Sequence, residues 1–155
     1  MNLHDLSREI KSVLKEDKRD LGNIVHKDRI SLILVDGLGW NIAQRLNTSV
    51  KPEKINSIFP SITVTVFATL LTAKRPGEHG ILGWRIYDRE EGRILNLMKV
   101  LKEQSVELDT FFSNTDSVFI MPEVATKSMM SKLKVIPYYT YWDGLYKYKL
   151  ALENK

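Results

Sequence analysis

The feature that most constrains the fold is the apolar run "ISLILVD" at residues 30–36, which ends in a single acid. Its residues are mostly β-branched or leucine, with no polar alternation. This pattern is typical of a strand that is covered on both faces, as in a parallel sheet. A tight turn at "GLG", residues 37–39, and a short helix at "WNIAQRLN", residues 40–47, are expected to follow. Strand, turn and helix in this order predict an α/β fold with a mostly parallel sheet flanked by helices.

Apolar residues recur at helical spacing over residues 3–16 and predict an amphipathic helix there. Residues 62–73 allow two interpretations. The segment "ITVTVF" has strand propensity, but Val64, Phe67 and Leu70 share one helix face, and "KRPGEHG" is a typical helix stop. We favour extended chain up to Ile62 and a helix over residues 63–73.

Three more elements are expected later in the chain. A hairpin is expected around "REEG" at residues 89–92, a buried strand at "SVFIMP", residues 117–122, and a final helix within residues 140–155. That helix carries large apolar side chains on one side: Trp142, Leu145, Tyr146 and Leu150.

Composition predicts an ordinary globular chain. Its 155 residues suit a single domain over residues 1–155, and 43% are hydrophobic and 27% charged. The chain has no cysteine, which excludes disulfides, thiolate zinc sites and a cysteine nucleophile, and makes a reducing cytosol the expected location. No apolar run approaches the ~20 residues that a membrane span needs, and the charged start "MNLHDLSREIKSVLKE" is unlike a signal peptide.

The last 29 residues contain six lysines and two acids, Asp143 and Glu153. Their net charge of +4 equals the net charge of the whole chain. The commoner interpretation is a solvated lysine-rich surface. The alternative is a partner that carries phosphate groups or is a nucleic acid. The lysines are Lys127, Lys132, Lys134, Lys147, Lys149 and Lys155.

Asp36 is the first candidate site residue. At the end of a buried parallel strand, its carboxylate would face the crevice where open α/β sheets bind ligands. A buried carboxylate needs a cation or a set of donors, so either a divalent metal or a helix N-terminus would stabilise it. The glycines after it do not form a dinucleotide fingerprint, because the third glycine position is Ile42.

Thr63 is the second candidate. If a helix begins here, its hydroxyl lies among unpaired N–H groups at the positive end of the helix dipole, which favours an anion. The commoner role of such a threonine is an N-cap. A threonine hydroxyl is a poor nucleophile unless its pKa is lowered, and a bound metal lowers it.

The three histidines give weaker signals. His79 is isolated in the turn "PGEHG", where a structural, hydrogen-bonded role is the common one, and His4 and His26 have no partners at ligand spacing. The aromatic residues in "YYTYWDGLYKY", residues 138–148, fit the packing of a final helix or, as the less common alternative, a platform on which bases stack.

Taken together, residues 31–83 resemble the N-terminal part of the type I phosphodiesterase and nucleotide pyrophosphatase family of the alkaline phosphatase superfamily. The resemblance rests on "LILVDGLGW", on "FPSITVTVFATLLTAKRPGEHGILGW", and on the 26 residues between Asp36 and Thr63. The family pattern is Phe-Pro-[Ser/Thr]-x-Thr, an apolar helix, and a Pro-x-x-His-Gly-Ile turn. The matching residues are Phe59, Pro60, Ser61, Thr63, Pro76, His79, Gly80 and Ile81.

This resemblance implies an alkaline-phosphatase-like fold and hydrolysis of a phosphate-ester or nucleotide substrate with two divalent metal ions, usually zinc. It implies that Asp36 binds one metal and that Thr63 is both a ligand of that metal and the nucleophile. It also implies a donor to a phosphoryl oxygen two residues later; relatives often have asparagine there, and this chain has Thr65.

The family's later metal ligands lie in Asp-x-x-x-His, Asp-His and single-His segments, and this sequence contains none of these. We therefore expect weak or absent metal binding by this chain alone, and an incomplete sheet that favours self-association. Three hypotheses follow: a fragment of a longer enzyme, one half of a split enzyme with a complementary chain, or a non-catalytic phosphate- or nucleotide-binding module.

Overall fold

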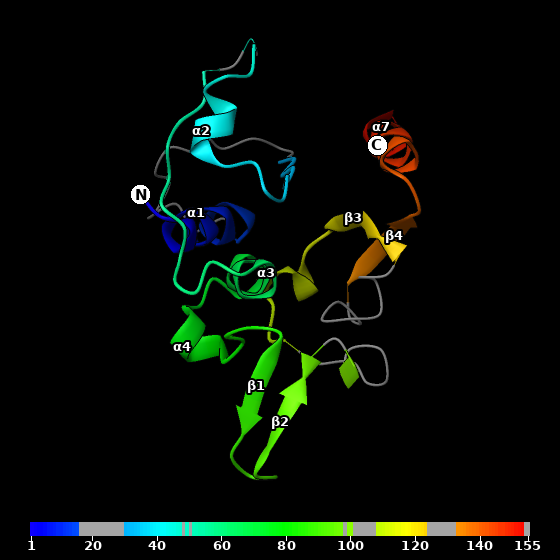
Figure 1. Ribbon diagram of the computed structural model, residues 1–155. Helices are drawn as coiled ribbons and strands as arrows, with labels where there is room; N and C mark the ends of the chain where they lie inside the picture. The colour runs from blue at the N-terminus through cyan, green and yellow to red at the C-terminus, as the bar shows by residue number, and fades with distance from the viewer. Residues whose placement is uncertain are drawn as a thin grey trace.

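The structure is a computed structural model, and it describes residues 1–15, 30–47, 49, 51–97, 99–100, 108–123 and 133–153 (Figure 1). Its named helices are α1 (Leu3–Leu14), α2 (Trp40–Ala43), α3 (Thr63–Thr72), α4 (Pro76–His79), the 3-10 helix η2 (Phe111–Asn114) and α7 (Tyr141–Glu153). Its named strands are β1 (Arg85–Asp88), β2 (Arg93–Asn96), β3 (Val118–Pro122) and β4 (Lys134–Tyr138). The described chain is thus mixed α/β.

Helix α3 lies near the centre of the described structure, next to α1, with the β3–β4 sheet to its right and the β1–β2 sheet below it in Figure 1. One core cluster joins Val64 to Leu97, which follows β2. A second cluster joins Leu71 to Met121 of β3, and Phe67 packs against both clusters. Full burial of a leucine such as Leu71 contributes about 1.5–3 kcal/mol, so α3 is the element on which both parts of the core depend.

The prediction of a helix over residues 63–73 is confirmed, and the strand alternative for residues 62–67 is wrong. Helix α3 begins at Thr63 after the extended Ile62 and ends before Ala73, which has a left-handed φ of 53°. Most of its residues are buried, including Thr65 and Thr69. A helix that is buried on most sides has no clear polar face, which is why its sequence also resembled a strand.

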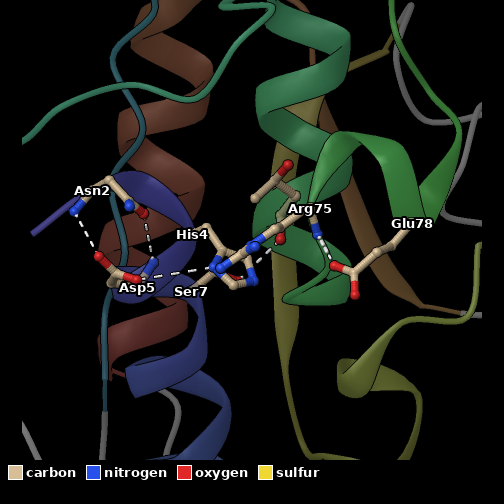
Figure 2. Close-up of polar contacts among 7 residues, drawn as sticks. Asn2, His4, Asp5, Ser7, Arg75 and Glu78 are labelled. Carbon is tan, nitrogen blue, oxygen red and sulfur yellow. Dashed lines mark hydrogen bonds and ion pairs between the residues drawn. The ribbon is translucent and has the colours of Figure 1, made fainter.

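Helix α1 confirms the predicted amphipathic helix up to residue 14; residue 16 lies outside the described residues. Figure 2 shows its N-terminal capping box, in which Asn2 Oδ1 accepts from Asp5 N–H and Asp5 Oδ2 accepts from Asn2 N–H, both at 3.0 Å. The fully buried Ser7 hydroxyl points at α3 and lies 3.0 and 3.1 Å from the carbonyl oxygens of Thr69 and Leu70. One polar contact in the middle of α1 therefore joins the two helices.

The predicted hairpin is confirmed. Strands β1 and β2 pair antiparallel, with Arg85 opposite Asn96 and Asp88 opposite Arg93. The turn between them contains Gly92 with φ +62°, a conformation that favours glycine.

The strand predicted at residues 117–122 is also confirmed as β3. It pairs in parallel with β4, so that Val118 lies opposite Lys134 and Pro122 opposite Tyr138. Strand β4 was not predicted; it contains Pro137, which lacks the N–H of a regular ladder. The final helix is confirmed as α7, which packs on β3 and β4. However, Trp142, Leu145 and Tyr146 on its apolar side are exposed.

The opening strand is where the prediction was wrong. Residues 30–36 form no strand, and Ile33, Leu34 and Val35 are all at least half exposed. A strand exists only when a neighbour completes its hydrogen bonds, and the described part of the chain places none beside this segment. The predicted mostly parallel sheet is replaced by two separate two-stranded sheets, one parallel and one antiparallel, and the alkaline-phosphatase-like arrangement is not confirmed.

The helix expected at residues 40–47 is shorter than predicted: α2 ends at Ala43, and turns follow it. In the described residues we find no helix with the length and apolar character of a membrane span.

Candidate functional site

Asp36 and Thr63 meet at the surface. Thr63 Oγ1 donates a hydrogen bond to Asp36 Oδ2 over 3.3 Å, although the two residues are 27 positions apart. Both residues are exposed. The distance is one that the hydrolase hypothesis requires, while the catalytic and metal-binding roles of the two residues stay predictions.

Asp36 is held by a turn and not by a strand end. Leu38 N–H donates to Val35 O at 3.4 Å, and Gly37 has φ +75°, which other residues rarely adopt. A Cβ placed on Gly37 or Gly39 would meet nothing within 4 Å. Gly37 is therefore explained by its backbone conformation, and the space around both glycines is open.

Thr63 is the first residue of α3. The N-cap is Ile62, and no side chain caps the helix, so the interpretation of Thr63 as a plain N-cap is wrong. The first hydrogen bond of the helix runs from Val66 N–H to Ile62 O at 2.9 Å. The N–H groups of residues 63–65 precede it, and they have no acceptor in the described structure. Such N–H groups at the positive end of a helix stabilise a bound anion.

Thr65 lies elsewhere. It is fully buried, and its Oγ1 has no hydrogen-bond partner among the described residues. Two positions along a helix correspond to about 200° of rotation, so its side chain points away from the side of α3 that carries Thr63. Its predicted contact with a phosphoryl oxygen stays a prediction.

The Asp36–Thr63 pair fits two positions of a metal site. Two oxygen ligands about 2.0–2.1 Å from one tetrahedral zinc ion lie about 3.3–3.4 Å apart, and Asp36 Oδ2 and Thr63 Oγ1 are 3.3 Å apart. A catalytic zinc ion needs three protein ligands. The part of the chain that the structure describes gathers no group of three or more His, Cys, Asp or Glu side chains that could hold a metal ion.

The structural interpretation of His79 is confirmed. Ile81 N–H donates to His79 Nδ1 at 3.0 Å, so the ring proton is on Nε2, which lies 3.0 Å from Thr69 Oγ1. Burial lowers the pKa of His79 below its ordinary value of 6.5, against the opposing effect of Glu78. A neutral His79 therefore joins α4 to α3. The sequence analysis did not identify Thr69 as the partner of His79. The only sequence signal for this contact is the helical periodicity of α3, which places Thr69 on the side that faces α4.

His4 lies 3.9 Å from the carboxylate of Asp5 (Figure 2). His26 lies outside the described residues.

The lysine- and tyrosine-rich end has both engaged and exposed side chains. Lys147 Nζ donates to Pro137 O at 2.7 Å and to Asp143 Oδ2 at 2.9 Å. The Lys147 hydrogen bond, followed by that from Tyr139 N–H, lowers the pKa of Asp143. The Lys149 side chain is far more exposed than that of Lys147, and its Nζ lies 3.8 Å from Glu153 Oε1. Tyr139 and several other aromatic residues here are exposed, and their role as a stacking platform is not tested.

The site thus places a carboxylate beside a threonine hydroxyl at the N-terminus of a helix, in a mixed α/β chain. The sequence model of one family, type I phosphodiesterase / nucleotide pyrophosphatase, matches residues 31–138, well over half of the chain. The chain belongs to this family. Comparison with curated proteins and with solved structures found no match.

Proposed function

We propose that the chain is a metal-dependent phosphoric-ester hydrolase of the phosphodiesterase or nucleotide pyrophosphatase type, with Thr63 as its nucleophile. The observation that supports the proposal most is the 3.3 Å contact between Thr63 Oγ1 and Asp36 Oδ2. The family assignment supports a phosphate ester or nucleotide as the substrate class.

The roles of the chain's own residues follow from this geometry. Asp36 Oδ2 accepts the Thr63 hydroxyl hydrogen, which turns a lone pair of Oγ1 outward to the substrate. Oγ1 attacks phosphorus while its proton passes to Asp36 Oδ2 and from there to solvent, one ester bond breaks, and the leaving alcohol or phosphate departs with its electron pair. The N–H groups of residues 63–65 hold the phosphoryl oxygens. Water then hydrolyses the ester on Thr63 and restores its hydroxyl.

Asp36 and Thr63 would also hold a divalent metal, for which the family resemblance suggests zinc and a second ion of the same kind. Such an ion lowers the pKa of the hydroxyl and neutralises charge on the phosphoryl group. The remaining ligands would come from a complementary chain, because this sequence contains none of the family's later ligand segments. For this reason we expect weak metal binding and low activity from this chain alone.

The test is hydrolysis of bis-p-nitrophenyl phosphate with added zinc or manganese. Thr63→Ala should abolish turnover, and Asp36→Asn should lower it at least about a hundredfold. Ser49→Ala, at another exposed hydroxyl, is the matched control and should keep the wild-type rate. Equal rates for wild type and Thr63→Ala would remove Thr63 from the chemistry.

A second candidate is a non-catalytic phosphate- or nucleotide-binding module. The observation in its favour is that the described residues gather no group of three or more metal-binding side chains. Its test is salt-dependent binding of RNA or nucleotides. Because Lys147 is already bonded to Asp143 and Pro137, Lys149→Gln should weaken this binding more than Lys147→Gln. Binding that does not respond to salt would exclude this function for the lysine-rich end.

A further inference from the structure

A polar pocket lies at the opposite end of α3 from Thr63. It has a volume of about 150 Å³ and forms where the ends of α1 and α3 meet the start of η2. Lys11, Lys15, Lys74, Asp109 and Asn114 contribute to its walls. With a rise of 1.5 Å per residue, the ten residues of α3 separate this pocket from Thr63 by about 15 Å.

The pocket has more positive than negative charge, with three ammonium groups and one carboxylate. Lys74 Nζ pairs with Asp109 Oδ2 at 3.1 Å, but the Asp109 side chain is 89% exposed, and such pairs are weak. The ammonium groups of Lys11 and Lys15 have no hydrogen bond or ion pair within the described part of the chain. The hydrogen bond from Lys74 is the main cause of the lowered pKa of Asp109, and the charges of Lys11 and Lys15 lower it further.

Helix ends explain only part of this surplus of lysines: Lys11 lies in the last turn of α1, where a cation is favourable. The carbonyl oxygens at the end of α3 would attract cations, but they already accept hydrogen bonds from neutral groups. Ser7 Oγ lies within 3.1 Å of Thr69 O and Leu70 O. Thr110 Oγ1 donates to Leu71 O at 2.8 Å. The ammonium groups of Lys11 and Lys15 are therefore available to another acceptor.

We propose that this pocket binds a phosphate group, either inorganic phosphate or the terminal phosphate of a small ester. Each water takes about 30 Å³ of liquid, so the pocket has room for a group of four oxygens. Lysine ammonium groups are common phosphate ligands, and the Asn114 side-chain amide, at the same pocket, supplies further donors. The site is separate from the Asp36–Thr63 pair and does not depend on the proposed hydrolase activity.

The test is calorimetric titration of the full chain with inorganic phosphate, at fixed ionic strength and with a chelator present. Lys11→Gln and Lys15→Gln should each weaken binding about tenfold, because each removes one charged hydrogen bond. Asp109→Asn should tighten binding severalfold, because it releases Lys74 and removes the opposing charge. A general disturbance of the fold would not produce this gain.

A control variant separates this site from the rest of the surface. Lys51→Gln, at an exposed lysine outside the pocket, should bind phosphate as the wild type does. Equal affinity in wild type and Lys11→Gln, or no saturable binding, would overturn the proposal.

A nucleoside monophosphate and the matching nucleoside distinguish the source of the phosphate. If the monophosphate binds and Lys11→Gln weakens that binding, the ligand is the terminal phosphate of an ester. If only inorganic phosphate binds, the ligand is the free ion. Equal affinity for the nucleoside and its monophosphate would also overturn the proposal.

Discussion

At the scale of single residues, His79 shows how a turn residue becomes a structural link. Its two ring nitrogens lie 3.0 Å from Ile81 N and from Thr69 Oγ1, so both are occupied while the ring is neutral. A second ring proton on Nδ1 would face the Ile81 N–H and break that bond. Neutral His79 therefore stabilises the joint between α4 and α3, and protonated His79 does not.

This makes stability depend on pH. Burial lowers the pKa of His79 in the folded chain below 6.5, so the unfolded chain binds the proton more readily. We expect the free energy of unfolding to fall as pH falls from 7.5 to 5.5. The lowered pKa values of Asp109 and Asp143 start from 3.8, so these groups act only in more acidic solution. Urea unfolding at the two pH values measures the change.

His79→Gln is the control for this prediction. It should be less stable than the wild type at pH 7.5 by about 1–2 kcal/mol, because two hydrogen bonds are weakened or lost. Its stability should change less between the two pH values. An equal change in the variant and the wild type would assign the pH dependence to other groups.

At the scale of elements, the sequence predicted helices and turns correctly from local signals, but it did not predict which strands pair. Helix α3 and the β1–β2 hairpin were predicted correctly because their signals are local. Residues 74–80 form a helix stop, and residues 89–92 form a turn, and each signal depends only on residues that are adjacent in the sequence. Residues 30–36 were predicted as a strand from their composition, but a strand also needs a partner, which composition does not specify. Strand β4 was missed as well, and its pairing with β3 likewise depends on a partner distant in the sequence.

The contact between α1 and α3 gives a prediction at this scale. Ser7→Ala should lower the free energy of unfolding by about 1–3 kcal/mol, because it removes the side-chain donor to the carbonyl oxygens of Thr69 and Leu70. Ser49→Ala, at an exposed serine, should change it by less than about 0.5 kcal/mol. Urea unfolding of both variants checks the prediction, and equal effects would mean that the buried contact contributes little.

At the scale of the whole molecule, the exposed apolar side chains of the described residues include two stretches. One is the segment at residues 32–35, and the other is the side of α7 formed by Trp142, Leu145 and Tyr146. Contiguous exposed apolar surface is typical of an interface. The sequence predicted both stretches as elements that pack, and the structure leaves them uncovered. We therefore retain self-association as a proposal.

Sedimentation velocity tests this proposal. The wild type should form larger species as concentration rises, and Ile33→Lys should shift the distribution towards the monomer by placing a charge in the apolar segment. Ile94→Lys is a matched control, because Ile33 and Ile94 are both 67% exposed and Ile94 lies on the hairpin. Equal effects of the two substitutions would exclude the 32–35 segment as a specific interface.

The candidate site was predictable in part. The meeting of Asp36 and Thr63 followed from the family resemblance, because local sequence does not show which residues 27 positions apart will touch. The expected reason for the meeting, a buried strand that ends at Asp36, was wrong, since a turn with Gly37 places the carboxylate instead. The sequence pattern thus identified the two residues that meet, but the backbone that positions Asp36 is a turn and not the expected strand.

The most direct test of the central claim, that Thr63 beside Asp36 is the nucleophile, is mass spectrometry of the chain quenched in acid during turnover of bis-p-nitrophenyl phosphate with zinc or manganese. We predict a nitrophenylphosphoryl group on Thr63, formed as one nitrophenolate is released, and no such group in Thr63→Ala. Turnover with no adduct at Thr63, or with the adduct on another residue, would contradict the account.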